Sequence, residues 1–137
     1  MKSLNPSCPF VAMLTIANGK ITTSDTISTF VRGPVVWVIV NNDEYEYFVE
    51  IDYAKIKHKG TGKSGHPFPH TRHNQADVPA APKGGVSLAA IVEVIKDYKP
   101  GAPHDIYKYT VDLLDAAKVP IDFLDPDVDV VDPYPFM

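Results

Sequence analysis

Cysteine is nearly absent from this sequence, and its scarcity limits how the fold can be stabilised. The 137 residues include one cysteine, Cys8, so no intramolecular disulfide can form. A chain of this length buries about two-thirds of its unfolded surface, which supplies a hydrophobic core without disulfide or metal crosslinks. The sequence therefore predicts a single domain over residues 1–137, and the free thiol is typical of a cytoplasmic protein in a reducing compartment.

The sequence also lacks the features of nucleic-acid-binding and membrane proteins. Thirteen Lys and Arg residues against 17 Asp and Glu residues give a net charge of −4, so there is no basic excess to neutralise phosphates. The apolar stretch at residues 10–17 is short and is interrupted by Thr15, which fits neither a secretory signal nor a membrane span. We expect neither a nucleic acid nor a membrane among the partners.

Motifs that would indicate an enzyme are missing as well. No Gly-x-Ser-x-Gly sequence presents a nucleophilic serine, and Cys8 has no base beside it in the sequence. Residues 60–64 imitate the end of a phosphate-binding loop, but Lys57 stands where that motif requires its first glycine. We therefore expect a protein that is not an enzyme and that uses no cofactor.

The densest apolar run, Val35 to Val40, predicts the central strand of a sheet. It holds four valines, one isoleucine and the single tryptophan, Trp37, and β-branched side chains favour strands over helices. Gly33-Pro34 before the run and Asn41-Asn42-Asp43 after it are turn formers. A run that is apolar at every position predicts a strand that is buried on both faces.

Alternating apolar and polar residues predict further short strands with turn residues between them. These strands lie at residues 10–17, 26–31, 45–51, 106–113 and 128–131, with a hairpin turn at Asn18-Gly19. Residues 86–96 are compatible with a strand or a helix, and their β-branched content favours the strand. Residues 115–118 suit a helical turn. About seven strands with frequent turns predict an all-β fold, a Greek-key β-sandwich.

Residues 55–85 show no hydrophobic periodicity and predict one long irregular loop. Such a loop in a compact domain is often functional. It contains His66, His70 and His73, and neutral imidazoles at this spacing can converge on zinc or copper. The other interpretation is a solvated loop whose histidines bind nothing. The sequence alone leaves both open, and we assign no metal site from it.

Three aspartates alternate with apolar residues and proline near the C-terminus. On a strand, Asp125, Asp127 and Asp129 would share one face with successive Cα atoms about 6.5–7 Å apart. Such a row can bind a hard cation such as Ca²⁺, or it can keep a strand edge in water and protect it from aggregation. We favour the second interpretation.

Several of these segments resemble the cupredoxin family. The resemblance lies in Val36-Trp37-Val38, in the turn Asn41-Asn42-Asp43, and in Pro100-Gly101 followed by Tyr107-Lys108-Tyr109. It implies a cupredoxin-like sandwich in which Tyr47 and Val111 stand where the family has a ligand histidine and the ligand cysteine. A blue-copper site needs a thiolate and two imidazoles, so the resemblance implies the fold without the copper or electron transfer.

Aromatic residues are the remaining candidates for a binding surface. We predict an interface that uses the side chains Tyr45, Tyr47, Tyr107, Tyr134 and Phe136, because aromatic residues are enriched where proteins meet. Packing between neighbouring strands explains the tyrosines equally well. The sequence thus predicts a non-enzymatic module that binds a protein partner or self-associates as a homo-oligomer. The alternative is a metal-binding or metal-handling protein that uses His66, His70 and His73.

Overall fold

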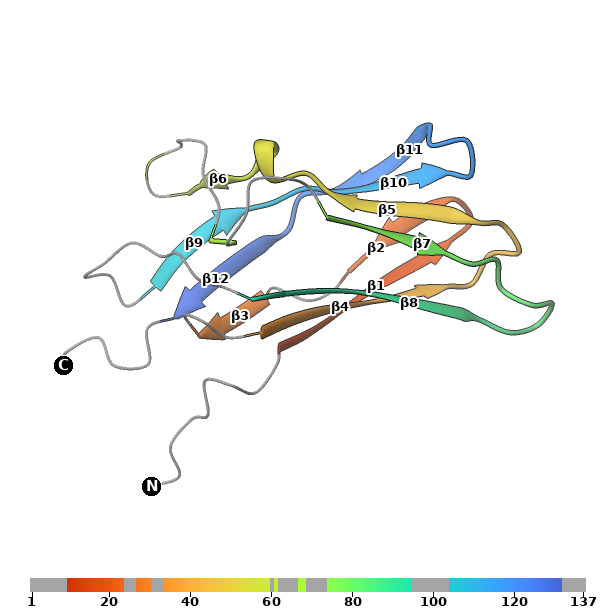
Figure 1. Ribbon diagram of the computed structural model, residues 1–137, viewed down its shortest axis with the longest axis horizontal. Helices are drawn as coiled ribbons and strands as arrows, with labels where there is room; N and C mark the ends of the chain where they lie inside the picture. The colour runs from red at the N-terminus through yellow and green to blue at the C-terminus, as the bar shows by residue number, and fades with distance from the viewer. Residues whose placement is uncertain are drawn as a thin grey trace, which may run out of the picture.

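The structure, a computed structural model, describes residues 10–23, 27–30, 34–59, 61, 67–68, 74–94 and 104–131. Within these residues the chain forms twelve strands and one short 3₁₀ helix (Figure 1), so the predicted all-β class is confirmed. The strands are β1 (Phe10–Ala17), β2 (Lys20–Thr22), β3 (Ile27–Phe30), β4 (Pro34–Asn41), β5 (Tyr47–Ile51), β6 (Lys57–His58), β7 (Asn74–Val78), β8 (Ser87–Val94), β9 (His104–Lys108), β10 (Val111–Asp115), β11 (Pro120–Leu124) and β12 (Asp127–Val131), and the helix η1 spans Tyr53–Lys55. In this described part no helix is long and apolar enough to cross a membrane.

The strands are arranged as a sandwich of two layers with a third small sheet at one end (Figure 1). One layer has the strand order β2-β1-β4-β8, and the other has the order β11-β10-β5-β7. The third sheet, β3-β12-β9-β6, runs from one layer to the other, because β9 leads into β10 while β3 contacts β1 and β4. The predicted sandwich is therefore confirmed, with its strands divided into more segments than the sequence pattern indicated.

Polar contacts join the two layers along both sides. On one side the Ile21 amide of β2 donates to Asp122 Oδ2 of β11 at 2.9 Å. On the other side Glu93 Oε1 of β8 accepts hydrogen bonds from the Tyr53 hydroxyl of η1 and from Asn74 Nδ2 of β7, the latter at 2.6 Å. Glu93 is buried, and a buried carboxylate is tolerated when it is hydrogen-bonded.

Trp37 lies at the centre of the core between the layers. Its side chain has no exposed surface, and its Nε1–H donates to the Tyr109 hydroxyl at 3.0 Å. Phe68 packs against the Trp37 ring at a centroid distance of 6.0 Å and stacks on Tyr53 at 4.8 Å. Burying these large aromatic side chains, with the indole N–H hydrogen-bonded, stabilises the centre of the core.

Several local predictions are confirmed. β1 has the expected bounds, and residues 87–94 form a strand and not a helix. Asn18 and Gly19 connect β1 to β2 with φ angles of 55° and 72°, the left-handed conformations that a two-residue hairpin turn requires and that Asn and Gly adopt readily.

Other predictions are wrong in part. Residues 55–85 are not irregular throughout, because β6 and β7 lie within them. β7 has a weak apolar periodicity: its inward positions are held by Asn74, Ala76 and Val78, and its outward residues, Gln75 and Asp77, are polar. Residues 115–118 belong to the hairpin turn between β10 and β11, where the Lys118 amide donates to the Asp115 carbonyl at 2.8 Å, and β11 itself was not predicted.

The expectation that Val35 to Val40 is buried on both faces is also wrong. β4 is central, since it pairs with β1 on one side and with β8 on the other. Val35, Trp37 and Ile39 point into the core and are fully buried, whereas Val36, Val38 and Val40 point outward and are only half-buried. Within the described residues no second layer covers this outer face.

Replacing Trp37 with alanine should lower the free energy of unfolding by about 3–5 kcal/mol, because it leaves a large cavity in the core. Tyr109→Phe should cost about 1–3 kcal/mol, because it keeps the ring but removes the acceptor of the indole N–H. Denaturant melts followed by far-UV circular dichroism measure both values. A loss below about 1 kcal/mol for Trp37→Ala would contradict a core position for this side chain.

Candidate binding site at the loop end

Four connections meet at one end of the sandwich, to the right in Figure 1. They are the β1–β2 turn (residues 18–19), the β4–β5 loop (residues 42–46), the β7–β8 loop (residues 79–86) and the β10–β11 turn (residues 116–119). We call these four segments together the loop end. Loops carried on a rigid sandwich are the usual place for binding residues.

The buried side chain of Asn41, the last residue of β4, forms hydrogen bonds to two of the four connections of the loop end. This side chain has no exposed surface. The carboxamide Nδ2 donates to the Tyr45 carbonyl and to the Pro79 carbonyl, each at 2.9 Å, while Oδ1 accepts from the Asp43 amide at 2.9 Å. One buried side chain therefore shapes the β4–β5 loop and attaches the β7–β8 loop to it, with both donor hydrogens and the oxygen in use.

Asp43 ties the β4–β5 loop to the β1–β2 turn. Its Oδ1 accepts from the Asn18 amide at 2.8 Å, and its Oδ2 accepts from the Gly19 amide at 2.9 Å and from the Tyr47 hydroxyl at 2.7 Å. The Asp43 carbonyl in turn accepts from the Ala81 amide at 2.8 Å. Hydrogen bonds to a carboxylate are stronger than those to a neutral acceptor, so these contacts fix three of the four connections.

The hydrogen bonds of Asp43 also determine which groups are charged. Partial burial raises the pKa of the Asp43 carboxyl, but the bonds from Gly19, Tyr47 and Asn18 outweigh burial and hold the pKa below its ordinary value. Burial, together with the hydrogen bond to Asp43 and its negative charge, raises the pKa of Tyr47 to about 12. At neutral pH the pair is therefore an ionised carboxylate and a neutral phenol.

A groove opens between the β4–β5 loop and the β10–β11 turn, with a volume of about 690 Å³. It is lined by residues Glu44, Tyr45, Glu46, Tyr47, Ala80, Asp115, Ala116, Ala117 and Ile121. The alanines leave room for a ligand, and the Tyr45 ring is 72% exposed beside them. A smaller hollow of about 310 Å³ lies next to it and shares Glu46, Tyr47 and Ala116 with the groove.

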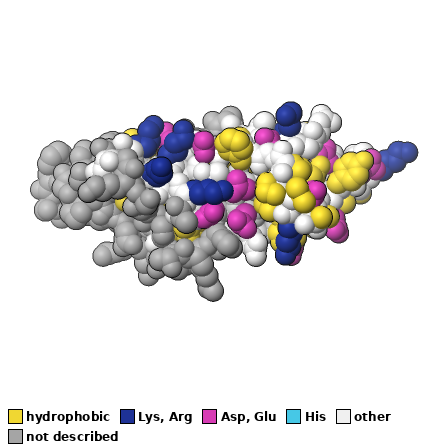
Figure 2. Space-filling view, turned by 90° about the horizontal axis from the view of Figure 1, so that it is seen from above, with side chains coloured by type: hydrophobic (Ala, Val, Ile, Leu, Met, Phe, Trp, Pro, Cys, Tyr) yellow, Lys and Arg dark blue, Asp and Glu magenta, His cyan; other side chains and the backbone are white. Residues whose placement is uncertain are grey.

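The groove combines apolar walls with acidic side chains. Among its lining residues are three carboxylates, those of Glu44, Glu46 and Asp115, and no Lys or Arg. Figure 2 views the outer surface of the β11-β10-β5-β7 layer, and hydrophobic side chains gather there toward the loop end with acidic side chains among them. The groove is therefore suited to a ligand that is apolar and positively charged.

The structure divides the tyrosines that were predicted for an interface. Tyr45 is exposed in the groove, whereas Tyr47 and Tyr107 are core residues with 6% and 7% of their surface exposed. The burial of Tyr47 and Tyr107 agrees with packing inside the sandwich, while Tyr45 is exposed to solvent. Tyr134 and Phe136 lie outside the described residues, so their interface role stays a prediction.

The histidines of the predicted metal site, His66, His70 and His73, lie outside the described residues as well. His58 is described: its Nδ1 is 3.2 Å from both the Thr61 amide and the Thr61 hydroxyl, and its ring meets Tyr107 edge-on at 5.2 Å. In the described ranges no three His, Cys, Asp or Glu side chains are grouped so that they could hold a metal ion. A histidine metal site stays a prediction.

The two positions that resemble copper-ligand positions do not meet. Tyr47 begins β5 and pairs with Asp115 at the loop end. Val111 pairs with Ile51, at the other end of the same strand, and is fully buried. The two pairs are four positions apart along β5, a distance of about 13 Å, so this structure does not bring Tyr47 and Val111 into one site.

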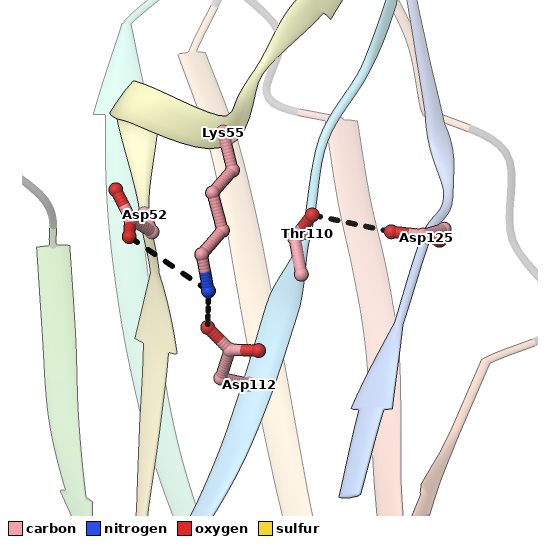
Figure 3. A network of polar contacts seen from close by, with 5 residues as sticks. All are labelled: Asp52, Lys55, Thr110, Asp112 and Asp125. Atoms are coloured by element: carbon pink, nitrogen blue, oxygen red, sulfur yellow. Dashed lines mark hydrogen bonds and ion pairs between the residues drawn. The ribbon is translucent and has the colours of Figure 1, made fainter. Parts of the chain in front are cut away.

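Asp125 and Asp127, two described carboxylates near the C-terminus, have separate partners. Asp125 accepts from the Thr110 hydroxyl at 3.1 Å (Figure 3), and Asp127 pairs with Lys59 at 3.1 Å. Lys55 Nζ forms ion pairs with the carboxylates of Asp52 and Asp112, at 4.0 and 3.4 Å, on the β11-β10-β5-β7 layer (Figure 3). Ion pairs this exposed contribute little to stability. The contacts of Asp125 and Asp127 agree with the interpretation of the aspartates as solvent-facing.

Most residues of the groove were not predicted from the sequence. The signal at Asn41-Asn42-Asp43 indicated a turn, but the partners of Asn41 and Asp43 lie up to 38 residues away in the chain. Ala80, Ala116 and Ala117 carry no functional group and become groove residues only through the meeting of the loops. No local pattern could have identified them.

Asn41→Asp and Asn42→Asp form a matched pair that tests the role of Asn41. The first change should destabilise the fold by at least about 3 kcal/mol, because it removes two donated hydrogen bonds and places a carboxylate against two carbonyl oxygens. The second should change stability by less than about 0.5 kcal/mol, because Asn42 is exposed. Urea melts measure both, and equal effects at the two positions would contradict the assigned role.

Asp43→Asn should lower stability by about 1–2 kcal/mol at pH 7, since Asp43 is only partly buried and its bonds are weaker than fully buried ones. The pKa of Asp43 is lower in the folded than in the unfolded state. The stabilisation that Asp43 contributes is therefore complete above the unfolded-state pKa of about 3.9. It is lost as the pH falls through the folded-state pKa. The difference between wild type and variant should therefore shrink below about pH 4.

Stability curves measured by denaturant melts at several pH values test this dependence. Asp125→Asn serves as the control, because Asp125 is exposed and accepts one hydrogen bond from Thr110. A difference between wild type and Asp43→Asn that stayed constant from pH 7 down to about pH 2 would contradict the ionised state of Asp43.

Comparisons with known proteins identify no relative for this chain. No family model matches it, and neither a curated protein nor a solved structure gives a match. The function proposed below therefore rests on the groove, the loop-end hydrogen bonds and the charges of the described residues.

Proposed function

We propose that the protein is a non-enzymatic binding module and that its loop-end groove binds a protein segment carrying Arg or Lys next to an apolar side chain. The observation that carries this proposal is the groove of about 690 Å³, in which an exposed tyrosine and small apolar residues lie beside three carboxylates and no basic side chain. A groove of this size accommodates two or three side chains of a peptide.

Charge complementarity selects the basic part of the ligand. Asp115 Oδ1 accepts hydrogen bonds from the backbone amides of Ala117 and Val119, at 2.9 and 3.0 Å. Asp115 therefore mainly stabilises the β10–β11 turn. Glu44 and Glu46 are exposed at the groove, and among the described residues none forms an ion pair with them. Two such carboxylates attract a cationic partner and raise its association rate.

The Tyr45 ring supplies the apolar and aromatic contact. A guanidinium or ammonium group over a tyrosine face gains cation–π attraction, and exposed tyrosines are frequent at the energetic centre of interfaces. The backbone of Tyr45 is held by the hydrogen bond from Asn41 to its carbonyl. A loop that is ordered before binding loses less conformational entropy on binding, which favours affinity.

The charge states at the loop end favour binding over catalysis. A general acid or base works best when its pKa lies near the operating pH. The pKa of Tyr47 is raised to about 12 while that of Asp43 is lowered, so near neutral pH Tyr47 keeps its proton and Asp43 stays ionised. Their hydrogen bond instead supports a structural role for the pair, which orders the wall of the groove.

The cupredoxin resemblance and a Greek-key connection of the strands are part of this proposal. Support comes from the two-layered sandwich and from the ordered turn at Asn41-Asn42-Asp43. The module we propose is a sandwich of that general class without a blue-copper site, because Tyr47 and Val111 provide neither an imidazole nor a thiolate and lie at opposite ends of the β5–β10 pairing.

A fluorescein-labelled peptide of alternating Arg and Leu residues tests the proposal by fluorescence anisotropy. We expect saturable binding that weakens about tenfold or more in the variant Glu44→Gln/Glu46→Gln, because two attractive charges are lost. Tyr45→Ala should weaken binding by a similar factor, because it removes the exposed ring. Amide chemical shifts of isotope-labelled protein should move at Tyr45, Ala80 and Ala117.

The control removes two negative charges elsewhere on the surface. Glu50→Gln/Asp125→Asn changes the net charge equally but leaves the groove unaltered. Equal weakening in both double variants would indicate unspecific attraction to an acidic protein. That result, or an alternating Glu and Leu peptide that bound as well as the basic one, would overturn the proposal.

A further inference from the structure

The outer surface of the β2-β1-β4-β8 layer is apolar across three neighbouring strands. The strand registers place its outward side chains in three rows: Val11, Val36 and Val92; Met13, Val38 and Ala90; and Thr15, Val40 and Leu88. We call these nine positions the outer β1–β4–β8 face. Eight of the nine are apolar, the ninth is threonine, and none is charged.

This face is open to solvent in the single chain. Val11, Met13, Leu88 and Val92 are 52%, 51%, 62% and 59% exposed, while the three valines of β4 are half-buried between them. A sheet with one solvated face normally alternates apolar and polar residues along each strand. Here β4 is apolar on both faces from Val35 to Val40, a pattern typical of a strand that packs against another layer on each face.

The face has the dimensions of a small interface. Its three strands have eight residues each, so they span about 26 Å by 14 Å, or roughly 365 Å² in projection. The accessible area is larger than the projection, because side chains stand out from the sheet. Two copies together would bury at least about 730 Å² in projection, and the relief of the side chains brings the accessible area toward the roughly 1,000 Å² that a specific interface needs.

We infer that a second copy of this chain covers the outer β1–β4–β8 face, so that two sandwiches pack sheet to sheet as a symmetric dimer. A two-fold interface brings the same residues of both copies together, and a face without charges meets itself without repulsion. Twisted sheets with apolar faces pack at about 10 Å with strands about 30° apart. The inference does not depend on the loop-end groove, which no residue of this face lines.

Sedimentation velocity on the full chain over a range of micromolar concentrations tests the inference. We expect the wild type to dimerise and Met13→Lys/Leu88→Lys to weaken dimerisation at least about 100-fold, because a lysine buried without a partner opposes association. Both positions are more than half exposed in the single chain, so the variant should keep its far-UV spectrum and thermal midpoint. Leu88→Lys alone provides a milder variant.

The matched control is Val119→Lys/Phe123→Lys, which adds the same charges at apolar positions in the β10–β11 turn and on β11, 52% and 61% exposed. This control should dimerise like the wild type. A monomeric wild type, or a dimer that both double variants disrupt equally, would overturn the inference. So would a monomer that cosediments with phosphatidylcholine vesicles through this face, since lipid would then be the cover.

Peptide anisotropy on the monomeric Met13→Lys/Leu88→Lys variant separates this inference from the proposed function. Retained peptide binding together with lost dimerisation supports the outer β1–β4–β8 face as the dimer interface. Absence of peptide binding in every variant and in the wild type would refute the groove proposal and leave the dimer result unaffected.

Discussion

Asn41 carries the only carboxamide in the described part of the chain that is completely removed from solvent, and the loop end is arranged around it. Its amide group joins the carbonyls of Tyr45 and Pro79, and its oxygen holds the amide of Asp43. Because a buried polar group without partners is costly, these loops cannot separate without a penalty. Asp43 extends the constraint to the β1–β2 turn. The groove and the exposed Tyr45 ring follow from these contacts.

The two surfaces to which we assign binding belong to different parts of the sandwich. The groove lies between the β4–β5 loop and the β10–β11 turn, whereas the outer β1–β4–β8 face belongs to the opposite layer. A dimer formed through that face would leave both grooves open. In such a dimer, two linked grooves would increase the apparent affinity for a partner that carries two basic segments, because the second contact would form within the complex.

Prediction from the sequence was accurate where structure depends on neighbouring residues. The bounds of β1, the hairpin at Asn18-Gly19 and the strand at residues 87–94 follow from alternation, β-branching and turn chemistry. β7 was missed, because its polar outward residues and the small Ala76 give almost no periodic signal. Its position is set by pairing with β5 and by the hydrogen bond from Asn74 to Glu93, contacts that no window of sequence contains.

Local chemistry thus decided the strand type and the turns, since each depends on which residue stands at a position. Burial was decided by the tertiary structure. Tyr45 and Tyr47 are two residues apart and both line the groove, yet Tyr45 is 72% exposed and Tyr47 is buried. The apolar run of β4 indicated two buried faces, but within the described residues only the side of Val35, Trp37 and Ile39 is fully buried. Which side of a strand meets another layer depends on how distant segments pack, and that information is not local.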